Sequence, residues 1–239
     1  MSAYDKFYLL KSRDRTTESK SSSDFTIQLP HPINGKYELV SATVPNTIYT
    51  FAAGDDSNKI YFNEAGTPFT ASITPGFYST STIAAAIKTA MEDVGSYTYT
   101  VTIDSVTQRV TISAGADLFI LEFASREGAS ERLGFAREDT AAATSHTGDY
   151  VLNFALPHSL VVDIDRKESF QSSGQDSGSF YIPFDVNSSD VMIYSRDSKF
   201  SQNIEFRNQT SFPIQLKNTN NQIVDLNGAN WEMLLKKVN

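Results

Sequence analysis

Residues 73–112 constrain the fold most, because they hold the one convincing helix of the chain and a hairpin directly after it. A Pro-Gly pair at residues 75–76 predicts a tight turn, after which Ser79 or Ser81 can cap a helix. Gly95 is suited to end that helix. Between these signals, apolar residues recur at spacings of four, four and three, with alanines among them: Ile83, Ile87, Met91 and Val94.

The segment after the helix predicts a β-hairpin. Apolar residues alternate strictly with threonine over residues 97–103, a polar turn covers 104–108, and alternation resumes over 109–112. Because so short a helix is unstable alone in water, we expect its apolar face to pack on the hairpin. The hairpin residues expected in that contact are Val101, Ile103, Val110 and Ile112.

The rest of the chain is typical of an all-β protein. Residues 24–29 alternate cleanly up to a Pro-His-Pro break at 30–32, and residues 37–44 form a longer apolar strand that ends at Pro45. Trp231 opens the last strand and is expected in the core. Further short strands are predicted at 6–11, 59–62, 69–73, 118–123, 150–154, 160–164, 180–184, 191–194, 204–206 and 214–216. Many short strands separated by turns indicate a sandwich or barrel.

Composition excludes some classes of function. The net charge of −8 and the sequence pI of about 4.9 argue against a nucleic-acid surface, which needs concentrated Lys and Arg. No cysteine is present, so neither disulfides nor thiolate metal sites are expected. No apolar run approaches the roughly 18 residues of a membrane span, and residues 7–10 are too short to be the apolar part of a signal peptide.

The chain shows no pattern typical of an enzyme. His31, His146 and His158 have no metal-ligand spacing, and each is expected on the surface or in a turn. Asp163 and Asp165 lie two residues apart, which suggests two carboxylates on an exposed strand face. We therefore expect no catalytic, cofactor-binding or metal-binding residues, and no cofactor.

The N-terminal segment is the predicted interaction region. Residues 12–23 are polar with mixed charge, so residues 1–23 are expected to form a partly mobile arm that matters for assembly and not for folding. The apolar run before it offers an anchor for a neighbouring subunit. The candidate oligomer-interface residues are Phe7, Tyr8, Leu9, Leu10, Arg13 and Arg15.

Four short phrases, taken in order, resemble a known family. They are Val44-Pro45-Asn46-Thr47-Ile48-Tyr49, Ile73-Thr74-Pro75-Gly76-Phe77-Tyr78-Ser79, Arg132-Leu133-Gly134-Phe135 and Asp225-Leu226-Asn227-Gly228-Ala229-Asn230-Trp231. Their order is similar to that in the penton or minor capsid proteins of virophages, polinton-like viruses and related double-stranded DNA viruses. The resemblance implies a single jelly-roll in a capsid subunit that forms pentamers at five-fold vertices, without catalytic residues.

One region departs from that pattern by its length. A bare jelly-roll needs less chain than lies between Phe51 and Tyr150, so residues 52–149 are expected to form an inserted lobe with the helix and the hairpin. Residues 1–51 and 150–239 would then form the jelly-roll sandwich. A jelly-roll lectin or receptor-binding spike remains the alternative function, because the same fold serves both. An aromatic-lined groove would favour it, with Tyr97 and Tyr99 as candidates.

The resemblance also implies partners and a location. The expected partners are further copies of the chain in a homopentamer and the neighbouring major capsid protein, and a vertex fibre or host receptor is left open. Neither direct nucleic-acid contact nor a membrane span is expected. The implied location is the virion, with assembly in the host-cell cytoplasm or a virus factory.

Overall fold

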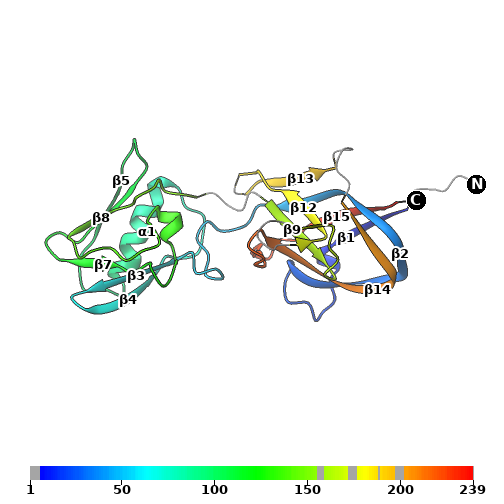
Figure 1. Ribbon diagram of the computed structural model, residues 1–239, viewed down its shortest axis with the longest axis horizontal. Coiled ribbons are helices and arrows are strands. Elements are labelled where there is room, and N and C mark those ends of the chain that lie inside the picture. Colours follow the sequence, from blue (N-terminus) through cyan, green and yellow to red (C-terminus); the bar gives the residue numbers. More distant parts are fainter. Residues whose placement is uncertain (1–5, 155–158, 172–176, 188, 197–201, 239) are drawn as a thin grey trace, which may run out of the picture. The chain divides into compact units, whose positions relative to one another are not determined.

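The computed structural model describes residues 6–154, 159–171, 177–187, 189–196 and 202–238 (Figure 1). The chain forms two compact units, which we call unit 1 (Met1–Ile48 with Pro157–Asn239) and unit 2 (Tyr49–Leu156). The sequence-based boundaries at residues 51 and 150 lie a few positions inside unit 2, because Phe51 and Leu152 pack in its core. His158 lies outside the described residues.

Unit 1 is built on one curled antiparallel sheet. Seven strands form it in the order β1-β15-β2-β14-β9-β12, with β13 beside β2. A separate two-stranded ribbon joins β10 to β11. The strands are β1 (Phe7–Lys11), β2 (Asp24–Pro45), β9 (Ser159–Ile164), β10 (Phe170–Gln171), β11 (Ser177–Gly178), β12 (Phe180–Pro183), β13 (Val191–Ser195), β14 (Asn203–Asn218) and β15 (Glu232–Lys237), and a 3-10 turn covers Ser12–Asp14.

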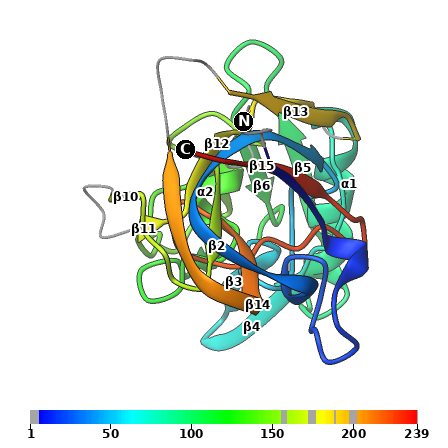
Figure 2. The ribbon, with the colours of Figure 1, turned by 90° about the vertical axis from the view of Figure 1, so that its right-hand side faces the viewer.

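Two long strands give unit 1 its curl. β2 and β14 pair over most of their length, and their register shifts on both sides of the pair Ile33 and Gln209. Such bulges bend a strand and increase its twist, and Figure 2 shows both strands bending around the core. This arrangement confirms the predicted all-β class with the curled antiparallel sheet of a jelly-roll.

The expected strand breaks differ from the structure at this bend. Residues 30–32 were expected to end a strand, and residues 204–206 and 214–216 to form separate ones. Instead, β2 and β14 each continue through the region, because the prolines at 30 and 32 fall where the β2–β14 ladder is interrupted. Proline has no N–H to donate, so it is tolerated within a strand at positions where no ladder hydrogen bond is formed.

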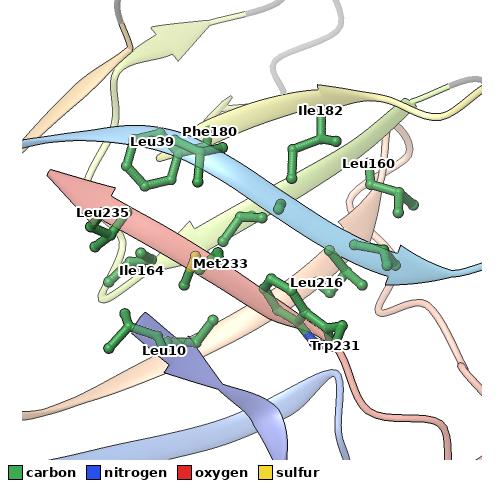
Figure 3. Packing of buried hydrophobic residues seen from close by; sticks show 14 of the residues in the cluster. Leu10, Leu39, Leu160, Ile164, Phe180, Ile182, Leu216, Trp231, Met233 and Leu235 are labelled. Carbon is green, nitrogen blue, oxygen red and sulfur yellow. The ribbon is translucent and has the colours of Figure 1, made fainter. Parts of the chain in front are cut away.

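The core of unit 1 joins both ends of the chain. Leu10 of β1 lies beside Met233 and Leu235 of β15, and all three are buried (Figure 3). Trp231 is 3% exposed, which confirms its predicted burial. Its ring meets Phe25 edge to face, and its Nε1–H donates to the Ser22 carbonyl oxygen at 2.8 Å.

The N-terminal segment is part of this fold, so the expected mobile arm is wrong for the described residues. β1 pairs with β15 throughout its length, and Ser12, Ser22 and Ser23 are buried. The Ser12 N–H donates to the Trp231 carbonyl at 2.9 Å, and the Trp231 N–H donates to Ser12 Oγ at 2.9 Å. The prediction failed because Ser12 and Ser22 are held by hydrogen bonds to Trp231, more than 200 residues away in sequence, and Ser23 by a backbone bond to Leu216, not by apolar burial.

Unit 2 has its own core of strands around one longer helix. Two three-stranded antiparallel sheets occur, with orders β4-β3-β7 and β5-β6-β8. The elements are β3 (Lys59–Glu64), β4 (Thr67–Ser72), α1 (Thr80–Glu92), β5 (Thr100–Ile103), β6 (Val110–Ser113), β7 (Phe119–Leu121), α2 (Ser130–Leu133) and β8 (Ser145–Thr147).

The predicted helix and hairpin are confirmed, except that α1 ends at Glu92, so Val94 lies beyond it and is exposed. Ser79 caps α1 in a reciprocal capping box with Thr82. β5 pairs with β6, although β5 begins at Thr100 and not at residue 97. The expected contact residues of helix and hairpin all belong to one cluster: Ile83, Ile87, Met91, Val110 and Ile112 fully buried, and Val101 and Ile103 partly buried.

Two expectations about polar residues were wrong. His146 was expected on the surface or in a turn, but it lies in β8 at 8% exposure, with Nε2 2.9 Å from the Phe119 carbonyl oxygen. Asp163 and Asp165 were expected on an exposed face. Asp163 is buried beside Lys217 Nζ at 2.8 Å, whereas Asp165 follows β9 in a left-handed conformation (φ 51°) and pairs with Lys167. The sequence could not show the partners of His146 and Asp163, because Phe119 and Lys217 come from other strands.

Candidate interaction face

The first strand of unit 1 has one buried and one exposed face. Tyr8 and Leu10 point toward the core, where Tyr8 meets Tyr37 edge to face and Leu10 is 2% exposed. Phe7 and Leu9 point outward and are 48% and 50% exposed. The alternation of a strand thus divides the candidate residues into two that stabilise the fold and two that are available to a partner.

The pairing register continues this outward face across three more strands. Residues directly opposite one another in an antiparallel sheet share a face. Two rows cross the strands in the order β1, β15, β2, β13: Leu9, Leu234, Ser41, Ser195, and Lys11, Glu232, Thr43, Ile193. We call the outward surface of these strands, with Phe7 and Val191, the four-strand face.

The four-strand face carries large apolar side chains next to small hydroxyls. Ile193 and Val191 of β13 are 72% and 52% exposed, and Leu234 of β15 is partly buried between its neighbours. Exposed apolar side chains gathered on one surface mark interaction sites more often than isolated ones do. An exposed sheet surface of this kind suits contact with another protein surface.

Charged groups border the apolar part of the face. Arg196, just after β13, forms an ion pair with Glu38 of β2, and Glu38 is only 7% exposed. The Lys236 ammonium lies 5.9 Å from the centre of the Phe7 ring. These groups form a polar rim like that around the apolar centre of many protein interfaces.

The two arginines of the predicted interface have different surroundings. Arg15 donates to the Ser12 carbonyl at 2.9 Å and to Asn230 Oδ1 at 3.0 Å. It therefore links the N-terminal segment to the residues just before β15. Arg13 and Asp14 form an exposed ion pair at 3.7 Å. Because an exposed pair is worth little, Arg13 is available to a partner, whereas Arg15 is engaged within the chain.

The face also ends in a strand edge. β1 is the last strand in the sheet order, and within the described residues it pairs with β15 alone. Edge strands present unpaired backbone groups that can accept another strand. Phe7 and Leu9 therefore lie next to two kinds of binding surface, an apolar face and a hydrogen-bonding edge.

Sequence reasoning missed the part of the face that lies on β13. Val191 to Tyr194 is an unbroken apolar run, so apolar residues necessarily point to both sides of the strand. That signal was present but was taken as an ordinary strand. Pairing β13 with β2 and β15 with β1 required the three-dimensional structure.

The described residues were expected to hold neither a metal site nor a membrane span. Within them, no group of three His, Cys, Asp or Glu side chains is placed to hold a metal ion. In the same ranges no helix is both long and apolar enough to cross a membrane. The interaction face is the candidate site that the geometry offers in unit 1.

No family model and no curated protein matches the chain. Among solved structures, the chain is similar to the crystal structure of the selenomethionine-labelled mavirus penton protein. The likeness covers 97% of this chain and 99% of that one, with 10% sequence identity and a TM-score of 0.46.

Proposed function

We propose that this chain is a structural subunit of a viral capsid, and specifically the penton subunit that forms homopentamers at five-fold vertices. The observation that carries the proposal is the four-strand face, a continuous outward surface with exposed apolar residues on a jelly-roll unit. Its partners are further copies of the chain and the neighbouring major capsid protein. Its location is the virion, after assembly in the cytoplasm or a virus factory of the host.

The phrases that carry the family resemblance support the proposal by their positions. The first and the last interlock in unit 1: Thr47 Oγ1 donates to the Leu226 carbonyl at 2.6 Å, and Asn227 Nδ2 donates to the Thr47 carbonyl. In the second phrase, Gly76 exchanges backbone hydrogen bonds with Phe51 at 3.0 and 3.3 Å. These phrases therefore lie where segments distant in sequence are joined by hydrogen bonds. Such positions favour particular residues.

The four-strand face supports a subunit contact by its chemistry. Stable interfaces bury an apolar centre inside a polar rim. Here Leu9 and Leu234 on one side and Ile193 on the other supply the apolar contacts, with Ser41 and Thr43 of β2 between them. The ion pair of Glu38 and Arg196 lies beside them. A second chain placed on this surface would remove three large aliphatic side chains from water.

Charge substitutions on the face test the proposal. Ile193→Asp and Leu9→Asp place a carboxylate at exposed positions, so they are expected to leave the fold intact while preventing oligomers and incorporation into capsids. Val106→Asp is the matched control, since Val106 is 87% exposed but lies in unit 2. Sedimentation velocity and co-assembly with the major capsid protein provide the readouts.

The two possible failures of this test mean different things. Oligomers that persist in both face variants would show that subunits meet through another surface. A wild-type protein that stays monomeric and never enters particles would contradict the capsid role itself.

A further inference from the structure

Unit 2 contains a groove that the proposed function does not use. It has a volume of about 660 Å³ and is lined by Arg109 and by parts of residues 127–137 and 149–153. Two apolar side chains on its wall are largely exposed, Tyr150 at 65% and Val151 at 57%. A concave surface with an exposed aromatic ring and several polar groups has the make-up of a ligand site.

The wall that carries Tyr150 is held in place by its backbone. The Tyr150 N–H donates to the Gly134 carbonyl at 2.8 Å, and the Asn153 N–H donates to the Arg132 carbonyl at 2.8 Å. From the other side, the Leu152 N–H donates to the Gln108 carbonyl at 2.9 Å. The ring is therefore presented to solvent on a fixed support, which lowers the entropy cost of binding.

Gly134 makes this support possible. It ends α2 in the left-handed conformation with φ 75°, and a Cβ there would lie 2.3 Å from the Tyr150 carbonyl oxygen. Only glycine combines that backbone conformation with so close an approach. The Arg132-Leu133-Gly134-Phe135 phrase thus positions one wall of the groove.

The charges in the groove nearly cancel. Three carboxylates, Glu127, Glu131 and Asp149, face two guanidinium groups, Arg109 and Arg137. Arg137 Nη1 already pairs with Glu127 Oε2 at 3.3 Å. A groove with this balance favours neither a polyanion nor a strongly cationic ligand, because either would meet groups of its own sign.

Two polar groups that line the groove have hydrogen-bonding capacity to offer a ligand. Asp149 Oδ2 accepts from the Ala136 N–H at 3.0 Å, which fixes the carboxylate, while its Oδ1 accepts no hydrogen bond within the described part of the chain. Arg109 is exposed and, in the same described ranges, makes no side-chain hydrogen bond or ion pair. An acceptor and a donor of this kind can together satisfy neighbouring hydroxyl groups.

We propose that this groove binds a neutral saccharide. One C–H face of a sugar ring packs on the Tyr150 ring, and hydroxyls of that sugar donate to Asp149 Oδ1 and accept from Arg109. Aromatic surface combined with a few oriented polar groups is the pattern by which proteins bind ligands that are apolar on one side and polar at the edge. The inference does not rest on the capsid role, because every residue that it uses lies in unit 2.

The test uses the full chain and four neutral disaccharides: lactose, maltose, cellobiose and N,N′-diacetylchitobiose. Saturation-transfer NMR and calorimetry at up to about 10 mM ligand detect a Kd of about 1 mM. At least one disaccharide is expected to bind, and 3′-sialyllactose to bind no better than lactose. Tyr150→Ala is expected to weaken binding by at least about tenfold, and Asp149→Asn by about threefold or more, whereas Tyr150→Phe keeps the stacking ring and binds nearly as well as wild type.

Leu118→Ala provides the matched control, since Leu118 is 56% exposed in unit 2 but does not line the groove. Near-ultraviolet circular dichroism checks that each variant is folded. The Tyr150 variants are expected to fold, because the side chain of Tyr150 is exposed. Failure of all four disaccharides to bind, or equal binding by wild type and Tyr150→Ala, would overturn the proposal. Loss of an oligomer in Tyr150→Ala without any sugar binding would also overturn it, because the groove would then be a contact between subunits.

Discussion

Units 1 and 2 are both built around antiparallel strands, but they close their cores in different ways. In unit 1 the strands that pair come from opposite ends of the chain, β1 with β15 and β2 with β14. In unit 2 every partner lies within residues 49–156, and one longer helix contributes three fully buried residues. Unit 1 therefore requires both termini, whereas unit 2 is one continuous segment.

This difference predicts how each unit responds to substitution. Non-local pairing makes a fold slow to form, because the chain loses loop-closure entropy before the distant strands gain their contacts. Such a fold also depends on each edge strand. Local pairing makes a fold that tolerates loss of the other unit. We expect two separable unfolding transitions, and the substitutions below are chosen to move one and not the other.

Trp231→Ala is expected to have the largest effect. It removes a ring that is 3% exposed and the hydrogen bond to the Ser22 carbonyl, at a cost of about 3–5 kcal/mol in the unfolding free energy of unit 1. Differential scanning calorimetry should show the transition of unit 1 lowered or lost and that of unit 2 unchanged. Trp231→Phe keeps most of the apolar contact and should lose less. An unchanged transition of unit 1 would contradict the burial.

Substitutions in β1 test next whether the N-terminal strand belongs to the fold. Leu10→Ala is expected to cost about 2–5 kcal/mol, because Leu10 is 2% exposed. Leu9→Ala changes the neighbouring residue on the opposite face, which is 50% exposed, and should cost about 0.5 kcal/mol or less. Urea titrations of both variants measure the difference. Equal stability of the two variants would mean that β1 does not belong to the core, as the mobile arm expected from the sequence implies.

The contrast between the units also explains what the sequence could predict. Hydrophobic period and turn residues are local signals, so they identified α1 and the β5–β6 hairpin in unit 2. In unit 1 they found most strands and the burial of Trp231. They did not reveal that Ser12, Ser22 and Ser23 would be buried, because the hydrogen-bond partner of Ser12 lies at Trp231.

The candidate face was predictable only in part for the same reason. The apolar run at residues 7–10 was recognised, but the alternation that turns Leu10 inward and Leu9 outward depends on pairing with β15. Ile193 joins the face only because β13 and β15 pair with opposite edges of β2. No period within one segment contains that information.

Gly134→Ala is expected to give a smaller effect that is confined to unit 2. An alanine there adopts an unfavourable left-handed conformation and meets the Tyr150 carbonyl oxygen, for a total of about 2–4 kcal/mol. Gly115→Ala is the control, because Gly115 has a similar φ of 68° but open space around its Cβ, so only about 1 kcal/mol is expected. Thermal melts of the two variants separate the cost of the left-handed backbone conformation from the cost of the close contact with the Tyr150 carbonyl oxygen. Equal losses would show that the close approach to Tyr150 carries no energy.

The last expected effect is confined to alkaline pH. Burial raises the pKa of Tyr37 from 10.0 to about 12, with Tyr8 beside it adding to the rise. The unfolded state then loses its proton first, so this contribution to stability is complete below pH 10.0 and is lost as pH rises through about 12. Tyr37→Phe should flatten the alkaline decline of the unit 1 transition. Burial also raises the pKa of Tyr99 in unit 2, so the decline of that unit should stay unchanged in the variant and serve as its control.

The most direct test of the central claim is the native mass of the purified wild-type chain, measured by light scattering and native mass spectrometry. A penton subunit that associates through its four-strand face is predicted to give a species of five times the chain mass of 26.4 kDa. Ile193→Asp should reduce that species to monomer, and Val106→Asp should not. A stable wild-type monomer across the accessible concentration range, or a trimer, would contradict the account.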